Sequence, residues 1–233
     1  MPFKKAIGNM YDWVTHVHTH LAGECPHKCK YCCVQTGVAK LSGRYKGEPR
    51  LVESELDANY GTRKIIFIEH LNDLFAEGIK DEWIKRILEH CRKYPENKYV
   101  FQTKNPERAL NYFTNCKELI FTGNILFGTT IETNRDTELY GNAPSPIDRI
   151  FAMMNFKGIM KTFITIEPIM DFDIRTLSNW IIDVKPEFVN IGADSKHCNL
   201  PEPSMNKIYE LVKILNENNI TIKKKSNLER LLR

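Results

Sequence analysis

Three cysteines, Cys25, Cys29 and Cys32, stand within eight residues of one another near the start of the sequence. This C-x3-C-x2-C spacing lets one short loop direct three sulfur atoms toward a single inorganic centre. Thiolates are soft ligands that suit an iron–sulfur cluster or zinc. No fourth ligand is obvious, because Cys33 follows Cys32 directly and adjacent cysteines rarely reach the same centre. Three protein ligands with one open coordination position are typical of a reactive metal site, whereas a structural site is closed.

The composition is that of an ordinary globular protein, with 233 residues of which 42% are hydrophobic and 27% charged. No apolar run is long enough to span a membrane, and the first residues lack the apolar core of a secretory signal. Seven cysteines in such a chain predict a reducing, cytoplasmic setting that keeps thiols free. The net charge of +4 is compatible with nucleic acid or an anionic substrate, but it is too small to indicate nucleic acid by itself.

Strands and helices are predicted to alternate along the chain. Strands are expected at 13–20, 64–69, 98–103, 125–131, 162–167, 188–193 and 220–224. Helices are expected at 51–60, from 81, from 105, at 145–155, at 175–184 and at 203–218. Asp81, Asn105 and Ser145 are the expected capping residues of three of these helices. The alternation predicts a parallel α/β architecture, and the absence of a low-complexity linker predicts one domain over 1–233.

Polar side chains lie at or just past the C-terminal ends of five successive predicted strands. They are Glu69, Gln102, Thr103, Lys104, Thr130, Glu132, Glu167 and Asp194. In (β/α) barrels the loops at this edge of the strands form the active face. Strand–helix loops are commonly polar, but that tendency alone does not explain five strands in a row ending in groups that can bind a ligand. We therefore expect these residues and the cysteine loop to share one site.

The motif formed by Cys25, Cys29, Tyr31 and Cys32, placed early and followed by repeated β/α units, resembles the radical S-adenosylmethionine (SAM) superfamily. Segments 72–75, 81–84, 102–108, 128–132 and 166–168 resemble one branch, a group of small phage-associated radical SAM proteins of mostly unassigned function. The resemblance extends over nearly the whole chain, from about residue 16 to residue 225. It implies a partial (β/α)6 TIM-type barrel with parallel strands.

The resemblance further implies that Cys25, Cys29 and Cys32 hold a [4Fe-4S] cluster whose fourth iron binds SAM through its amino and carboxylate groups. An external one-electron donor, flavodoxin-like or ferredoxin-like, would reduce the cluster. SAM would then be cleaved to a 5′-deoxyadenosyl radical that abstracts hydrogen from a substrate. The cofactors carry this chemistry, while the protein positions them and excludes water. We expect a monomer with no membrane association.

Three candidate SAM contacts lie close to the cysteine loop in this resemblance. Tyr31 occupies the aromatic position that packs near the adenine, although it could simply pack beneath the loop. Asn72 and Asp73 follow the second long strand, where the superfamily contacts the SAM amino group. Asp73 could accept a hydrogen bond from that ammonium group, although the usual glycine-rich motif is missing there.

Four more candidate cofactor-binding residues come from later strand ends: Lys104, Thr130, Glu132 and Glu167. The two glutamates could bind the ribose hydroxyls, the amino group of SAM or the substrate. A buried carboxylate needs a partner, so a glutamate paired with Lys104 is an equally good interpretation.

The run His16-x-His18-x-His20 departs from the phage-associated group. These side chains could line the barrel floor, where they would contact substrate or cluster, or they could bind a second metal. We expect instead that neighbouring groups satisfy them inside the protein. Cys198 could donate hydrogen to a product radical, but a loop cysteine without a role is favoured. Cys91 is expected to lie in the core.

The favoured function is a radical SAM enzyme. Little of the chain is expected to lie outside the barrel, and a small open barrel suits a bulky substrate. The phage association and the mild positive charge favour a nucleic-acid base or nucleotide as that substrate. The alternative is a non-catalytic nucleic-acid-binding protein stabilised by zinc or a cluster, in which His27 or Cys33 supplies a fourth ligand. An electron carrier is disfavoured because three cysteines leave the cluster incomplete.

Overall fold

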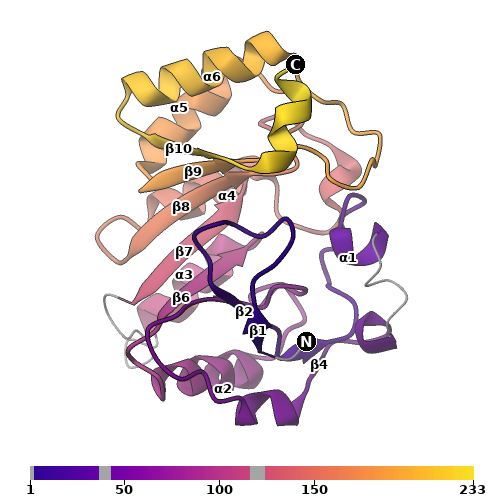
Figure 1. Cartoon of the computed structure of the whole chain (residues 1–233), viewed down its shortest axis with the longest axis vertical. Coiled ribbons are helices and arrows are strands. Elements are labelled where there is room, and N and C mark those ends of the chain that lie inside the picture. Colours follow the sequence, from indigo (N-terminus) through magenta and orange to yellow (C-terminus); the bar gives the residue numbers. More distant parts are fainter. Residues whose placement is uncertain (1–2, 37–42, 116–123) are drawn as a thin grey trace.

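The computed structural model describes residues 3–36, 43–115 and 124–233. Its main sheet has eight strands in the order β1-β2-β5-β6-β7-β8-β9-β10 (Figure 1). They are β1 (Lys4–Lys5), β2 (His16–His18), β5 (Ile65–Ile68), β6 (Lys98–Thr103), β7 (Ile125–Thr130), β8 (Lys161–Ile166), β9 (Phe188–Ile191) and β10 (Thr221–Lys224). Strand β1 runs antiparallel to β2, and the six remaining pairs are all parallel. The predicted parallel α/β architecture is confirmed, and β10 is a seventh parallel strand.

Five helices connect the parallel strands. They are α2 (Asp81–Arg92), α3 (Pro106–Asn115), α4 (Pro146–Met154), α5 (Ile174–Val184) and α6 (Met205–Glu217). Asn105 and Ser145 cap α3 and α4 as predicted, because each side chain accepts a backbone N–H three residues later. Asp81 is not a cap, since it is the first residue of α2 after Lys80 and its carboxylate pairs with Arg108 at 2.6 Å. None of the helices in the described ranges is long and apolar enough to cross a lipid bilayer.

The sheet has an outer face covered by helices and an inner face covered by the N-terminal segment. Alternate strand residues point to opposite faces, so Ile66 and Ile68 join the large core beneath the helices while Phe67 faces inward. Tyr11 and Val14 pack against Phe67 and its inward-facing neighbours. Among the described residues no pairing joins β1 to β10, so the barrel is open (Figure 1). This is the partial barrel that the sequence predicts.

Residues 51–60 do not form the predicted helix. Leu51 belongs to a two-residue strand, β4 (Arg50–Leu51), which pairs antiparallel with β3 (Leu21–Ala22). The backbone N–H of Val52 then donates to the carbonyl of His20 at 2.9 Å. Only Glu53–Asp57 forms a helix, and it is a short 3-10 helix. The pairing with β3 takes the backbone groups that an α-helix starting at Leu51 would need.

The predicted first strand, 13–20, contains only the short strand β2. Regular pairing ends at His18, because the carboxylate of Glu69 accepts the backbone N–H groups of His20 at 2.9 Å and Leu21 at 3.2 Å. The Glu69 side chain thus takes the place of the next backbone hydrogen bonds of the strand pairing. The chain leaves the sheet here and enters the cysteine loop.

His18 and His20 lie on the outer face of the sheet, so their placement on the barrel floor is wrong. Both are fully buried, and their rings stack with centroids 4.2 Å apart. The hydroxyl of Tyr60 lies 2.9 Å from a ring nitrogen of each histidine. The second nitrogen of His18 contacts Glu55 at 2.8 Å, and that of His20 contacts Glu69 at 2.7 Å. Neighbouring groups therefore satisfy these two histidines, as expected. Contrary to expectation, His16 is not interior, since it is only partly buried and its Nδ1 lies 2.9 Å from the Thr15 hydroxyl.

Lowering the pH is expected to destabilise the protein through His18. Burial, together with the neighbouring His20, lowers the pKa of His18 from 6.5 to about 3. Between pH 6.5 and about 3, His18 of the unfolded chain binds a proton that His18 of the folded protein does not bind. Stability is therefore complete above pH 6.5 and falls by up to about 1.4 kcal/mol per pH unit below it. Urea unfolding at a series of pH values measures this slope. A His18→Gln variant with the wild-type slope would contradict the assignment.

Candidate active site

The cysteine loop leaves β3 and lies at the barrel mouth, the edge where the parallel strands end. Its backbone is tightly turned, since the N–H of Lys28 donates to the carbonyl of Cys25 and that of Cys32 to Cys29. Burial raises the pKa of the Cys25 thiol, and nearby Asp73, Cys32 and Cys29 raise it further. Cys32 packs against the small apolar cluster that contains Cys29, and both thiols act electrostatically on Cys25.

The loop after β7 holds the cysteine loop from one side. The backbone N–H of Asn142 donates to the carbonyl of His27 at 2.7 Å, and the Cys29 thiol donates to the carbonyl of Tyr140 at 3.3 Å. Gly141 has a φ of +63°, and a Cβ there would lie 2.2 Å from the His27 carbonyl oxygen. Only glycine permits this close approach. Sequence reasoning missed these residues, because no motif connects them with the cysteines.

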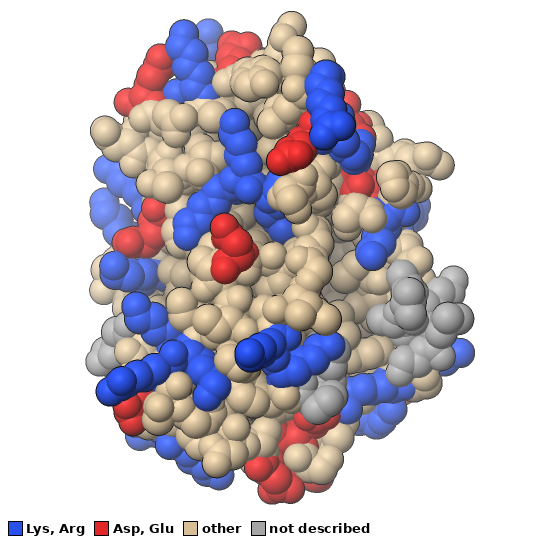
Figure 2. Space-filling model, in the orientation of Figure 1, with Lys and Arg blue, Asp and Glu red and all other residues tan. Residues whose placement is uncertain are grey.

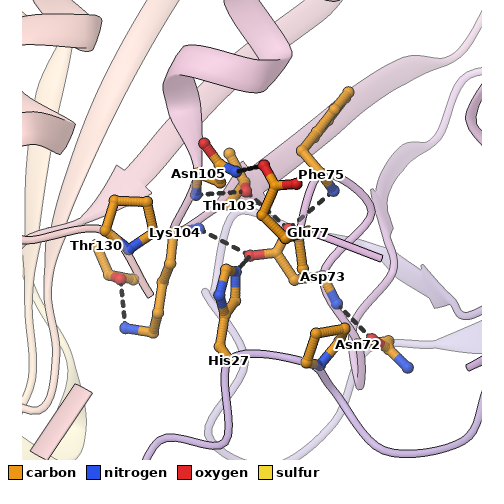
Figure 3. Close-up of polar contacts among 12 residues, drawn as sticks. His27, Asn72, Asp73, Phe75, Glu77, Thr103, Lys104, Asn105 and Thr130 are labelled. Carbon is orange, nitrogen blue, oxygen red and sulfur yellow. Dashed lines mark hydrogen bonds and ion pairs between the residues drawn. The ribbon is translucent and has the colours of Figure 1, made fainter. Parts of the chain in front are cut away.

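Asp73 holds the cysteine loop from the other side (Figure 3). Its Oδ2 accepts from Nε2 of His27 at 2.9 Å and from the backbone N–H of Lys104 at 2.8 Å. Its Oδ1 accepts from the Thr103 hydroxyl at 2.7 Å and the Phe75 backbone N–H at 3.0 Å. Burial acts to raise the pKa of Asp73, but the attraction and hydrogen bond of His27 lower it below its ordinary value. The carboxylate is thus ionised and fully hydrogen-bonded.

One cluster, centred on the ammonium group of Lys104, contains four of the predicted residues: Tyr31, Lys104, Thr130 and Glu132. Its Nζ donates to the Thr130 hydroxyl at 2.6 Å and to the Tyr31 hydroxyl at 3.1 Å, and it forms an ion pair with Glu132. Nζ also lies 5.1 Å from the centre of the Tyr31 ring. The strands β6 and β7 bring Lys104, Thr130 and Glu132 together, and the cysteine loop adds Tyr31. The predicted pairing of a glutamate with Lys104 is present.

Arg149 completes this network, and sequence reasoning missed it. Its Nη1 donates to Glu132 Oε2 and to the carbonyl of Thr130, both at 2.9 Å. Both Arg149 and Glu132 are fully buried. Burial acts to raise the pKa of Glu132, but Lys104 and Arg149 lower it well below its ordinary value. The available signal was helical spacing, since Arg149 shares the apolar face of α4 with Pro146 and Ile150.

The remaining predicted residues lie outside the Lys104 network. Glu167 pairs with Lys225 at 2.6 Å and also accepts from Asn227 and Asn9. Asn72 donates to the carbonyl of Gly23 at 3.3 Å and accepts the backbone N–H of Asp73.

Three of the other polar groups at strand ends serve the protein's own structure. Glu69 binds the backbone at His20 and Leu21, as described above. The Gln102 side chain faces inward and accepts from the Tyr11 hydroxyl at 2.7 Å. Asp194 accepts the backbone N–H groups of Lys196 and Cys198 in its own loop. The strand-end pattern therefore brought some of the predicted residues together around Lys104 but also included residues that lie elsewhere.

Cys198 packs beside the cysteine loop. It contacts a small apolar cluster formed by Cys29, Tyr31 and Met170. The turn after β9 that Asp194 stabilises presents this thiol to the loop. Cys91, by contrast, is fully buried in the core beneath α2, as predicted.

The chemistry of the donor set fits an iron–sulfur cluster. Cys25, Cys29 and Cys32 supply three soft thiols from one loop. A hydrogen bond from the Cys33 thiol, helped by the backbone N–H of Gln35, lowers the pKa of Cys32 to about 6 and favours its thiolate. Within the described part of the chain, no three His, Cys, Asp or Glu side chains lie close enough to hold one ion. A four-iron cluster binds each thiolate on a different iron atom, so its ligands stand further apart.

Solved structures share this fold. A spore photoproduct lyase variant matches with a TM-score of 0.63 and 11% identity, over 94% of this chain and 78% of that one. A second variant matches with 0.56 and 13%, over 81% of this chain and 58% of that one. SuiB of Streptococcus suis, bound to its precursor peptide SuiA, matches with 0.58 and 12%, over 89% of this chain and 48% of that one. Other matching structures of both proteins hold S-adenosylmethionine. This chain shares their fold and spans about half to three-quarters of their length.

Residues 13–184 match a family model described as "Protein of unknown function (DUF5131)". The match covers well over half of the chain, and the protein therefore belongs to this family. A comparison with curated proteins gives no match.

Replacing Glu132 by glutamine is expected to destabilise the protein by about 3–5 kcal/mol, because the buried Arg149 and the partly buried Lys104 would lose their counter-charge. Urea unfolding measures this free energy. Glu138→Gln is the matched control, since the Glu138 side chain is 94% exposed and should cost under about 1 kcal/mol. A cost for Glu132→Gln as small as that of the control would contradict the network.

Proposed function

We propose that the protein is a radical SAM enzyme in which Cys25, Cys29 and Cys32 hold a [4Fe-4S] cluster. The observation that carries this proposal is the position of the three-thiol loop, at the mouth of a parallel barrel and against Asp73 and Lys104. The fold shared with radical SAM enzymes supports it. When bound, the cluster and SAM together supply a 5′-deoxyadenosyl radical that abstracts hydrogen from the substrate. We take residues 1–233 as a single radical SAM core domain.

The side chains at the mouth would bind and orient SAM. Tyr31, held by the Lys104 ammonium group, presents a ring against which an adenine can pack. Lys104 is partly exposed, and it contributes a positive charge beside a hydroxyl, that of Thr130. Glu132 fixes Lys104 in this position from the buried side.

Two further regions flank this group. Asn72 and Asp73 lie beside the cysteine loop, where the superfamily contacts the SAM amino group. Asp73 already accepts four protein hydrogen bonds, so its contribution to SAM binding comes through the loop that it holds. Glu167, paired with Lys225 on the β10 side, is placed to accept from ribose hydroxyls or from substrate.

We propose a nucleic-acid base or nucleotide as the substrate. Figure 2 shows lysine and arginine side chains spread over the face that carries β1 and β10, with few acidic side chains near its middle. Lys4 and Lys5 lie on β1, and Lys223 and Lys224 on β10. One matching structure is spore photoproduct lyase complexed with a dinucleoside spore photoproduct. SuiB binds a precursor peptide, so a peptide substrate is the competing outcome.

The proposal implies particular partners and a setting. An external one-electron donor, flavodoxin-like or ferredoxin-like, would reduce the cluster. The free thiols require a reducing cytoplasmic environment. We further propose that the protein acts as a monomer and that its functional relatives are small phage-associated radical SAM proteins.

Anaerobically reconstituted protein is expected to carry about four irons and four sulfides per chain. With SAM and a reductant it should release 5′-deoxyadenosine. Alanine at position 25, 29 or 32 should abolish the release and lower the iron content. Cys91→Ala is the control, because that thiol is buried beneath α2, and it should retain both. Colourless protein carrying one zinc would overturn the proposal in favour of a zinc-stabilised nucleic-acid-binding protein. A Cys29→Ala variant that still cleaves SAM would also overturn the proposal.

Single-stranded oligonucleotide is expected to bind with an affinity that falls as salt rises, because phosphate contacts release counterions. A Lys223→Gln/Lys224→Gln variant should bind more weakly and show a salt slope reduced by about 0.7 per lost phosphate contact. Lys213→Gln is the control, since Lys213 lies on α6 beside Glu217. Fluorescence anisotropy measures both quantities. Equal binding by all three proteins would contradict a nucleic-acid substrate on this face.

A further inference from the structure

We infer that His27 is a positioning residue for the cysteine loop, tethered by Asp73. The inference rests on the proposed function, because the loop matters for catalysis only if it holds the cluster. His27 stands two residues after Cys25 and two before Cys29, and it is 3% exposed. Its Nε2 lies 2.9 Å from Oδ2 of Asp73. In Figure 3 the imidazole rises from the cysteine loop to the carboxylate.

The contact between His27 and Asp73 is rigid because other hydrogen bonds fix the orientation of the Asp73 carboxylate. Besides His27 it accepts a hydroxyl and two backbone N–H groups, from Thr103, Phe75 and Lys104. These donors belong to the end of β6 and to the loop after β5. The Asp73 carboxylate therefore holds the His27 ring in a fixed position relative to the end of β6 and the loop after β5. Groups that orient the ligands of a metal site by hydrogen bonds, without binding the metal themselves, typically contribute about 10- to 100-fold in metal affinity.

The backbone of His27 is held independently of its side chain. Its carbonyl accepts the N–H of Asn142 at 2.7 Å, and Gly141 lies directly against it. The side chain is thus fixed by the β5 and β6 ends and the main chain by the loop after β7. A residue held at both points fixes the path of the loop between its first two thiols. It also engages Nε2 with Asp73, so this nitrogen is not available as a metal ligand.

Three variants separate the hydrogen bond from the shape of the ring. His27→Gln places an amide donor near the position of Nε2. His27→Phe keeps a ring but has no donor, and His27→Ala removes both. Lys30→Ala is the matched control, because Lys30 is exposed in the same loop and its ion pair is a 3.5 Å contact with Glu138.

The first measurement is the rate at which the reconstituted cluster loses iron to a chelator without oxygen. We expect His27→Phe and His27→Ala to lose iron about 10-fold faster than wild type or more, His27→Gln to stay within about threefold, and Lys30→Ala to match wild type. Asp73→Asn should lose iron at least as fast as His27→Phe, because it weakens the His27 contact and also disturbs the hydrogen bonds from Thr103, Phe75 and Lys104.

The second measurement uses the cluster-free protein and does not depend on activity. Hydrogen exchange of the peptide covering 24–33 should be faster in His27→Phe than in wild type, with β6 exchanging at the wild-type rate. Unchanged β6 exchange shows that the variant is folded. Faster exchange confined to the loop supports the tether.

The outcomes distinguish the two proposals. Wild-type protein without an iron–sulfur cluster would overturn the proposed function, and the loop exchange would still test the tether. A His27→Phe variant with wild-type iron loss and wild-type loop exchange would overturn the positioning role. A folded His27→Gln variant that behaves like His27→Phe would overturn the assignment to the hydrogen bond with Asp73.

Discussion

A buried carboxylate, that of Glu132, is the constraint on which the barrel mouth depends. A fully buried negative charge is costly unless cations and hydrogen bonds surround it. Here Lys104 arrives from the end of β6 and Arg149 from the buried face of α4. Neither contact is local in sequence, so the pairing ties two strand ends and a helix into one arrangement. Lys104 can then reach Tyr31, which links the charge network to the cysteine loop.

Contacts with neighbouring loops hold the cysteine loop in position. It contains a short turn and almost no regular structure before the four-residue helix α1 (Cys33–Thr36). Its geometry comes from two neighbouring loops, through Asp73 on one side and the Gly141 region on the other. The proposed metal site would need ligands whose positions do not depend on the metal alone. The contacts that fix the backbone and the side chain of His27 would meet that need.

The inner face of the barrel explains why the proposed site is confined to the mouth. Tyr11 and Trp13 from the N-terminal segment stack against each other and contact Phe163. The Tyr11 hydroxyl lies within hydrogen-bonding distance of both Gln102 and Thr165, and burial raises its pKa well above the ordinary value. The lower part of the barrel is thus filled by side chains. A cofactor or substrate is left with the edge where the strands end.

The sequence by itself determined the class of fold. The nearly continuous apolar run at 64–69 is typical of a buried strand, and parallel strands align their C-terminal ends, so the polar residues at these ends were expected to share one edge. The spacing of the three cysteines predicted the ligand chemistry that we propose. What the tertiary structure decided is which polar groups face one another. Glu69, Gln102 and Glu167 follow strands just as Lys104 and Glu132 do, yet their partners are elsewhere. For the same reason, Arg149 and Gly141 could not be identified from the sequence. The position of His18 and His20 on the outer face of the sheet could not be predicted either. Such contacts join residues tens of positions apart, and they depend on side-chain direction and sheet curvature, which a local pattern does not encode.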